Sequence, residues 1–417
     1  MRARRRGLSA QYRFPETGTR FLLYPQARTV RGFELPRLVR LAARPGTIGP
    51  GPRDARLEVI DALHKAPYRA PGTGEYVWRP PYPRSKPRRR RVRPSAQGHF
   101  DHLVPGTPAF AAAATFAAAA CALDIWEHYL GRLRFRLNPR QRRFELIPRV
   151  RRLGDNAYSG VGYVEFGFAH ADPRQPYCEN LDVVAHEVGH HILRAVLGPT
   201  PTGETALEHK AHAEAAADLV SLVVVLHFDR VVSHLLEQTR GKLYSENVAS
   251  QIGEFRDEWS GRLGARTAFH DRRLEDVARA RRKGDFHAYG RPFLGAAYEV
   301  LVEIYESHLV RRELISPRLA RRSSRATARA RRSLRGAFAA RFRLNPDGFG
   351  DALRDATADF ARLLAAAWTA TRGQPATFAR VARNLVRADR RLTSGRYGRI
   401  IRHAFGERGI ATGSRRA

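Results

Sequence analysis

Two histidines four residues apart constrain the fold of this 417-residue chain more than any other feature. On an α-helix, residues at this spacing share a face, so both imidazoles can reach one point beside the helix. The flanking residues favour such a helix, because Asn180 or Asp182 can cap its start and Gly198 can end it. Its buried contacts would come from Val183, Val184, Val188, Ile192 and Leu193. The segment from His186 to His190 is therefore predicted to lie on a buried helix.

Glu187 stands between these histidines, in the string His186-Glu187-Val188-Gly189-His190. Zinc accepts imidazole nitrogen, and a catalytic zinc site has three protein ligands with one position left for water. Glu187 lies about 100° around the helix from His186, so its carboxylate can reach that water without displacing a ligand. It would take the proton of the water and pass it to the leaving group. The string thus predicts a Zn2+ site with a general base; two surface histidines are the simpler alternative.

The third ligand has to come from elsewhere in the chain. The metzincin pattern requires glycine and histidine shortly after the second histidine, and Leu193 and Val196 occupy those places. A following helix offers Glu214 and Asp218, which lie one turn apart and can both face the metal helix. We expect Glu214 to bind the metal and Asp218 to accept the second ring N–H of a metal-bound histidine. Burying two carboxylates beside the apolar run that follows would be costly without such partners.

Four other residues of the same segments have side chains that could bind a metal ion or contact its ligands. Glu208 and His212 are alternative third ligands, since zinc accepts both carboxylate oxygen and imidazole nitrogen. His191 and His209 are expected either to contact the ligands from outside or to be exposed. Glu214 is the ligand that we prefer.

With these residues the sequence resembles the thermolysin-like gluzincin peptidases, and bacterial relatives in which a His-Glu-x-x-His helix precedes a Glu-x-x-x-Asp helix. The segment Asp182–Glu187 matches the family's entry into the metal helix. Asn156, Ala157 and Tyr158 stand where the family has an Asn-Ala-aromatic edge strand that holds an extended substrate. The resemblance covers residues 98–226 closely and the later residues loosely. It implies a zinc metalloendopeptidase acting on peptides or proteins.

The family also uses a histidine from its C-terminal helical half to hydrogen-bond the oxyanion of the tetrahedral intermediate. The nearest counterpart in this sequence is the segment Asp285–Gly290, ahead of a helix that Pro292 is expected to open. We assign His287 to this catalytic role, with Tyr289 as the alternative donor. Residues 397–405 resemble the last helix of the family's second lobe.

Some features of the family are missing. No tyrosine occurs between Ile192 and Ala213, no acidic cluster suggests calcium sites, and no signal sequence is visible after Met1. A cytoplasmic location is therefore expected, or a secreted one if the true start lies upstream. No stretch reads as apolar enough to cross a bilayer, so no transmembrane segment is expected. Cys121 and Cys178 are too few for a disulfide framework or a thiolate zinc site.

Composition divides the chain into three regions. Residues 1–97 are rich in arginine, proline and glycine, and are expected to be largely irregular with one short strand at Leu57–Ala62. Residues 98–228 form the expected catalytic lobe. Residues 229–417 form a helical lobe, interrupted by an arginine-rich insertion at about 316–343. The resemblance implies an α+β, thermolysin-like two-lobe fold, with a small sheet and the metal helix in the first lobe.

Within the catalytic lobe, the apolar pattern predicts a helix from Thr107 to about Leu130. Strands are expected at Leu133–Leu137 and Arg143–Ile147, where apolar and basic residues alternate. Residues 156–168 have the pattern of a strand, a turn and a second strand.

The net charge of +34 is the least ordinary property of the composition, and nearly all of the positive charge is arginine. A nucleic-acid binder would normally use lysine as well, because lysine serves phosphate contacts well. A solvated basic surface is the interpretation that we prefer. The alternative function is a basic protein that binds nucleic acid or an anionic membrane and carries a structural or vestigial zinc site.

Overall fold

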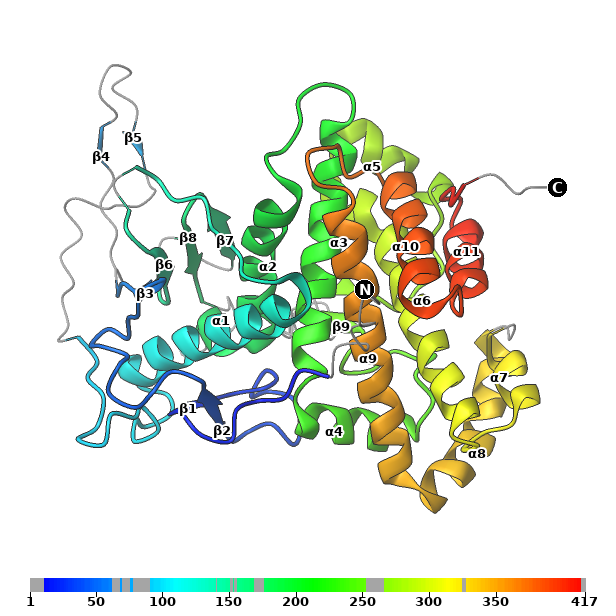
Figure 1. Ribbon diagram of the computed structural model, residues 1–417, viewed down its shortest axis with the longest axis horizontal. Coiled ribbons are helices and arrows are strands. Elements are labelled where there is room, and N and C mark those ends of the chain that lie inside the picture. Colours follow the sequence, from blue (N-terminus) through cyan, green and yellow to red (C-terminus); the bar gives the residue numbers. More distant parts are fainter. Residues whose placement is uncertain are drawn as a thin grey trace, which may run out of the picture.

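The computed structural model describes residues 11–61, 68–69, 76–77, 91–139, 141–150, 153, 156–168, 176–252, 266–324 and 328–413. The chain has an α+β fold, with small sheets and one long helix on one side and a group of helices on the other (Figure 1). Two helices, α2 (Leu181–Leu197) and α3 (Ala206–Val225), lie between these sides. The prediction of an α+β fold is confirmed.

A four-stranded sheet lies on the side of α2 that faces away from the helical group. Its strands are, in spatial order, β3 (Leu57–Val59), β6 (Phe144–Ile147), β8 (Tyr163–Phe166) and β7 (Ala157–Gly160). β6 runs parallel to β3 and β8, whereas β7 is antiparallel to β8. β7 is therefore an edge strand, and no described strand pairs with its outer side.

Helix α1 (Pro108–Leu130) crosses beneath this sheet and matches the predicted helix. Thr107 caps it, because Thr107 Oγ1 accepts a hydrogen bond from Phe110 N at 3.2 Å. By length and hydropathy α1 could cross a membrane, as could α3 joined to α4 (Asp229–Thr239), although 89% of the α1 window is buried inside the molecule. The prediction that no segment is apolar enough for a span is thus wrong. Such burial is typical of a core helix.

The strand predictions are confirmed except for one. The confirmed ones are β3, β6 and the β7–β8 hairpin, expected at Leu57–Ala62, Arg143–Ile147 and 156–168. Leu133–Leu137 forms no strand. Leu133 is instead tied to the end of α1, since its N–H donates to Glu127 Oε1 at 2.8 Å and its carbonyl oxygen accepts from Arg56 at 3.2 Å. These bonds occupy the backbone groups that a sheet ladder would need.

The described part of the N-terminal region is largely irregular, but it contains a packed hairpin in addition to the one short strand that was expected. β1 (Thr19–Leu23) pairs antiparallel with β2 (Arg37–Leu41). Phe21 on β1 is fully buried and stacks on Phe100 and Phe116, with ring centroids 4.8 and 5.8 Å apart. Alternate apolar positions on β1 face α1, and this burial orders the hairpin despite its arginines.

The two cysteines are buried free thiols. Cys121 lies on α1, as expected, and Cys178 lies in a 3-10 turn (Tyr177–Glu179) just before α2. Burial raises the pKa of both thiols above the ordinary value. Because the thiolate is the reactive form, this burial makes both thiols less reactive.

Helix α2 begins and ends where the sequence predicts. Asn180 Oδ1 accepts a hydrogen bond from Asp182 N at 3.2 Å, and Gly198 ends the helix with φ +97°. α2 packs closely on α3: a Cβ at Gly189 would lie 3.1 Å from the Val220 side chain. Glycine at the centre of the metal motif thus permits the two helices to approach.

The helical side is built around α6, which packs against α3, α9 and α11. Its α-helices after α4 are α5 (Ala278–Lys283), α6 (Phe286–Arg311), α7 (Pro317–Ser324), α8 (Ala328–Leu344), α9 (Pro346–Thr369), α10 (Phe378–Thr393) and α11 (Gly398–Glu407). Short strand pairs are β4 (Tyr68–Arg69) with β5 (Tyr76–Val77) and β9 (Gln251–Ile252) with β10 (Arg266–Thr267). A Cβ at Gly290 would lie 2.4 Å from the carbonyl oxygen of Ala211, so α6 also approaches α3 at a glycine.

Two details of the predicted helical lobe are wrong. The arginine-rich segment at 316–343 does not interrupt the helical pattern but forms α7 and most of α8, and Ser323 and Phe338 within it are fully buried. Arginine and alanine are good helix formers, which explains the helices. Pro292 does not open a helix, because α6 already begins at Phe286 and Pro292 lies inside it. The last predicted helix, at 397–405, is confirmed as α11.

Candidate metal centre

His186, His190 and Glu214 converge on one point between α2 and α3. One ligand atom from each residue lies within 4.8 Å of the other two. His186 Nε2 is 3.7 Å from Glu214 Oε2, and His190 Nε2 is 3.7 Å from Glu214 Oε1. The two imidazole rings are nearly perpendicular, at 89°. This group could hold a metal ion, and two imidazoles with one carboxylate are donors that zinc accepts.

Asp218 lies behind the group, one helical turn after Glu214 on α3. Its Oδ1 is 2.7 Å from His186 Nδ1, and its side chain is 2% exposed. A carboxylate this close to Nδ1 favours the tautomer that keeps the proton there and presents the lone pair of Nε2 to a metal. Asp218 thus lies beside His186, and its role toward a metal-bound histidine stays a prediction.

The charge of Glu214 is stabilised by the histidines around it. Burial raises the pKa of Glu214, but the hydrogen bond from His186 and the charges of His190, His186 and His287 outweigh burial, and the pKa falls below the usual range. Glu214 is thus a carboxylate across the ordinary pH range, as a metal ligand has to be.

Glu187 follows His186 directly on α2. Its side chain is largely buried, with 8% exposure. Helix geometry turns it about 100° from His186, away from the three ligand atoms. Arg194 follows Glu187 by seven residues, so both project on nearly the same side of α2, two turns apart.

The structure brings His287 to the metal group and leaves Tyr289 away from it. His287 lies in the first turn of α6, which Asp285 caps through a 3.0 Å bond from Ala288 N. His287 Nε2 is 3.4 Å from Glu214 Oε2, and the side chain is 56% exposed. Tyr289 is buried against Phe378, with ring centroids 5.2 Å apart.

The alternative ligands point elsewhere. Glu208 Oε1 accepts a hydrogen bond from Phe378 N at 2.8 Å. His212 is fully buried beside Phe293, and neither of its ring nitrogens has a hydrogen-bond partner among the described residues. Burial lowers the pKa of His212 to about 3, which keeps the ring neutral. Neither residue belongs to the group formed by His186, His190 and Glu214.

His191 and His209 are both buried, which rules out exposure, one of the two alternatives expected for them. His191 Nε2 lies 2.9 Å from Ser159 Oγ and 3.1 Å from the carbonyl oxygen of Tyr163, which links α2 to the β7–β8 hairpin. His209 Nδ1 accepts a bond from Ala376 N at 3.0 Å. Both side chains therefore join structural elements.

The residues proposed to contact substrate lie on the free edge of the sheet, next to α2 (Figure 1). Asn156 precedes β7, and its Oδ1 accepts a hydrogen bond from Ala157 N at 2.9 Å. Tyr158 is 50% exposed. Their contact with a substrate stays a prediction.

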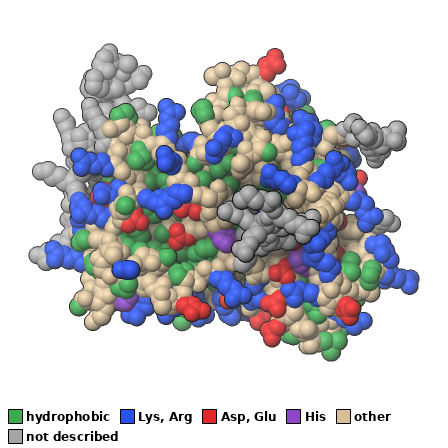
Figure 2. Space-filling model, viewed as in Figure 1, with side chains coloured by type: hydrophobic (Ala, Val, Ile, Leu, Met, Phe, Trp, Pro, Cys, Tyr) green, Lys and Arg blue, Asp and Glu red, His purple; other side chains and the backbone are tan. Residues whose placement is uncertain are grey.

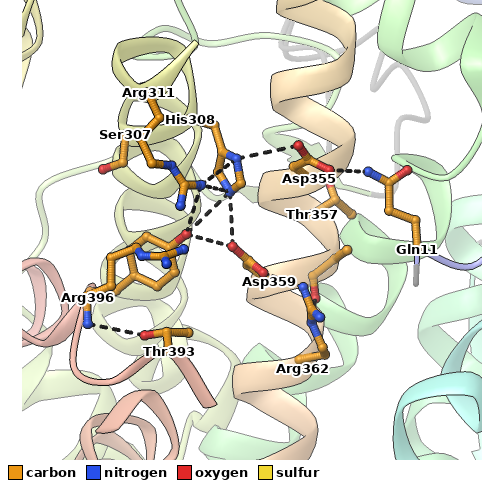
Figure 3. Close-up of polar contacts among 12 residues, drawn as sticks. Gln11, Ser307, His308, Arg311, Asp355, Thr357, Asp359, Arg362, Thr393 and Arg396 are labelled. Atoms are coloured by element: carbon orange, nitrogen blue, oxygen red, sulfur yellow. Dashed lines mark hydrogen bonds and ion pairs between the residues drawn. The ribbon is translucent and has the colours of Figure 1, made fainter. Parts of the chain in front are cut away.

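A second histidine–carboxylate cluster was not expected from the sequence. It joins His308 on α6 to Asp355 and Asp359 on α9 and to Tyr397 before α11 (Figure 3). The only signal in the sequence is the spacing of the aspartates, four residues apart on a helix.

Comparison with models of known protein families and with curated proteins gives no match.

Proposed function

We propose that this protein is a zinc-dependent metalloendopeptidase with a thermolysin-like two-lobe arrangement. One observation carries the proposal: His186, His190 and Glu214 form a group that could hold a metal ion, with Asp218 directly behind it. A structural zinc site is usually closed by four ligands, whereas the described residues supply three to this group. Three ligands leave room for water, which favours a catalytic site.

A zinc ion held by these ligands would supply electrophilic activation of water and of the substrate carbonyl. Glu187 accepts a proton from the attacking water and transfers it to the amine that leaves. His287 donates a hydrogen bond to the oxygen that gains negative charge, and its exposure allows substrate to reach it. The free edge of β7, with Asn156 and Ala157, pairs with an extended peptide and aligns it.

The test combines metal analysis with hydrolysis of a peptide library. Purified protein should carry about one zinc ion per chain, and chelation should abolish cleavage. Glu187→Gln should retain zinc and lower kcat/KM by about 10³-fold, because only the general base is removed.

Glu237→Gln is the matched control, since Glu237 is an exposed glutamate on another helix, α4. This variant should cleave peptides as the wild type does. Protein without stoichiometric zinc, or a Glu187→Gln variant that is as active as wild type, would refute the proposal.

The alternative of a polyanion-binding protein has less support. On the face shown in Figure 2, basic side chains are spread over both halves of the molecule and acidic side chains lie among them. A site built for nucleic acid would gather them into one patch or stripe. The alternative predicts binding to DNA, RNA or anionic vesicles that weakens steeply with salt and persists after chelation.

A further inference from the structure

We propose that Arg194 and Tyr158 form a subsite for an acidic side chain of the peptide substrate, two to three residues from the scissile bond. The inference rests on the proposed peptidase function and adds a substrate class to it. Three features of Arg194 support it: the face of α2 on which it lies, its contact with β7, and the absence of an ion pair with a described carboxylate.

The face of α2 places Arg194 in line with the catalytic groups. Starting from His186, helix geometry turns His190 by about 40°, Arg194 by about 80° and Glu187 by about 100°. Arg194 therefore projects between the directions of His190 and Glu187, but further along the helix. Its side chain is exposed, unlike those of Ile192 and Leu193 beside it.

The guanidinium group reaches the edge strand that is proposed to hold substrate. Arg194 NH1 donates to the carbonyl oxygen of Gly160 at 3.4 Å, at the end of β7 that lies away from Asn156. The phenol groups of Tyr158 and Tyr163 are its electrostatic neighbours. Tyr158 is half exposed, so its hydroxyl group is available to a ligand.

Arg194 forms no ion pair with any carboxylate of the described residues. Other arginines of the chain do pair: Arg56 with Glu127 at 2.7 Å, and Arg408 with Glu299 at 2.6 Å. Partial burial lowers the pKa of Arg194, although arginine stays charged at any ordinary pH. Among the described residues, the partly exposed guanidinium group of Arg194 meets a carbonyl oxygen and two phenols, so an incoming carboxylate would stabilise its charge.

Distances along the helix give the position of the subsite. Arg194 lies six residues beyond the midpoint between His186 and His190, which corresponds to about 9 Å along the helix axis. An extended peptide advances about 3.3 Å per residue. A peptide paired with β7 therefore presents a side chain to Arg194 about two to three residues from the bond at the metal. This residue lies toward Gly160 and away from Asn156.

Binding can be measured apart from catalysis in the Glu187→Gln protein with zinc bound. Fluorescence anisotropy is recorded with labelled peptides that carry Glu, Gln or Lys at each position in turn. We expect Glu at one position to bind about five- to tenfold more tightly than Gln, as for a partly exposed ion pair. Adding Arg194→Gln should remove this preference, and Arg194→Glu should transfer it to Lys.

Arg230→Gln is the matched control. Arg230 is also exposed and also donates to a glycine carbonyl at 3.4 Å, that of Gly32, but it lies on α4. This variant should keep the preference for Glu at the same position.

The outcomes separate the two proposals. Wild-type protein that cleaves peptides without an acidic preference, or a preference that survives Arg194→Gln, overturns the subsite and leaves the peptidase standing. Lack of zinc-dependent cleavage overturns the peptidase. If none of the peptides binds to the Glu187→Gln protein, the subsite is overturned as well.

Discussion

The His186–Asp218 and His308–Asp359 pairs are built alike but have different surroundings. In both, an aspartate on a neighbouring helix lies close to a ring nitrogen, at 2.7 Å from His186 Nδ1 and at 3.0 Å from His308 Nε2. In the first pair, the remaining nitrogen of His186 is directed toward Glu214, which His190 and His287 also approach.

The surroundings of His308 are closed by the protein itself. Arg311 lies 2.6 Å from His308 Nδ1, and the hydroxyl group of Tyr397 donates to Asp359 Oδ2 at 2.6 Å (Figure 3). Arg362 pairs with the other oxygen of Asp359. A metal ion would have to displace an arginine there, whereas His186, His190 and Glu214 each offer a ligand atom within 4.8 Å of the other two. The arginines beside His308 and Asp359 therefore mark the second cluster as structural.

The sharpest test of this contrast is removal of one imidazole from each cluster. His190→Ala should lose its zinc entirely, because two remaining ligands do not hold the ion. His308→Ala should retain about one zinc ion per chain and lose stability instead. Metal content by elemental analysis and thermal unfolding would be measured for both proteins. Equal zinc content in the two variants would contradict the contrast.

Asp218 and Asp359 should differ in the same way in their effect on zinc affinity. Asp218→Asn should weaken zinc affinity by about 10- to 100-fold, because His186 loses the acceptor that fixes its tautomer. Asp359→Asn should leave zinc affinity unchanged, since Asp359 belongs to the other cluster. Competition with a chromogenic chelator gives both affinities. An affinity of Asp218→Asn that equals the wild-type value would show that Asp218 has only a structural role.

Much of the metal centre could be predicted because helix periodicity fixes it. His186 and His190 share one helical face, as do Glu214 and Asp218, so the sequence left open only how the two helices pack. The glycine between the histidines, Gly189, permits that packing at α3. The choice between His287 and Tyr289 was not predictable, because it depends on how α6 meets α3.

The remaining differences between the predicted and the observed structure have a common cause. Local composition was taken as evidence of irregular structure in the N-terminal region and at 316–343, but both segments bury a few side chains at sites supplied by distant residues. Phe21 stacks on Phe100, and Ser323 donates to Glu306 at 2.7 Å and accepts from Lys242 at 2.7 Å. The cluster around His308 likewise joins residues from separate helices. Contacts of this kind carry no local periodicity, so one sequence does not reveal them.

Asp359→Asn should destabilise the protein in a way that depends on pH. Burial raises the pKa of Asp359, but hydrogen bonds from His308 and Tyr397 and the charge of Arg362 outweigh it and lower the pKa to about 2. Because the folded-state pKa lies below the unfolded value, the carboxylate stabilises the fold above about pH 4 and loses this effect as the pH falls toward 2. The loss in the variant should be about 2 kcal/mol at neutral pH.

Urea unfolding of wild type and variant at pH 7, 5 and 3 would measure the difference in the free energy of unfolding. That difference should be largest at pH 7 and 5 and smaller at pH 3. Asp351→Asn is the control, because Asp351 is an exposed aspartate on the same helix whose carboxylate pairs with half-buried Arg354. A difference for Asp359→Asn that does not change with pH would mean that its charge does not stabilise the cluster.

The smallest effect is expected for Tyr397→Phe, which keeps the buried ring and removes only its hydroxyl group. Asp359 then loses one donor but retains Arg362 and His308, so the free energy of unfolding should fall by about 1 kcal/mol. The same donor contributes to the low pKa of Asp359, so the loss should also diminish as the pH falls toward 3. Zinc content and peptide cleavage should stay at wild-type values, because the described partners of the Tyr397 hydroxyl group, His308, Arg311 and Asp359, all belong to the closed cluster. A Tyr397→Phe protein with unchanged stability but weaker zinc binding would reverse the assignment of the two clusters.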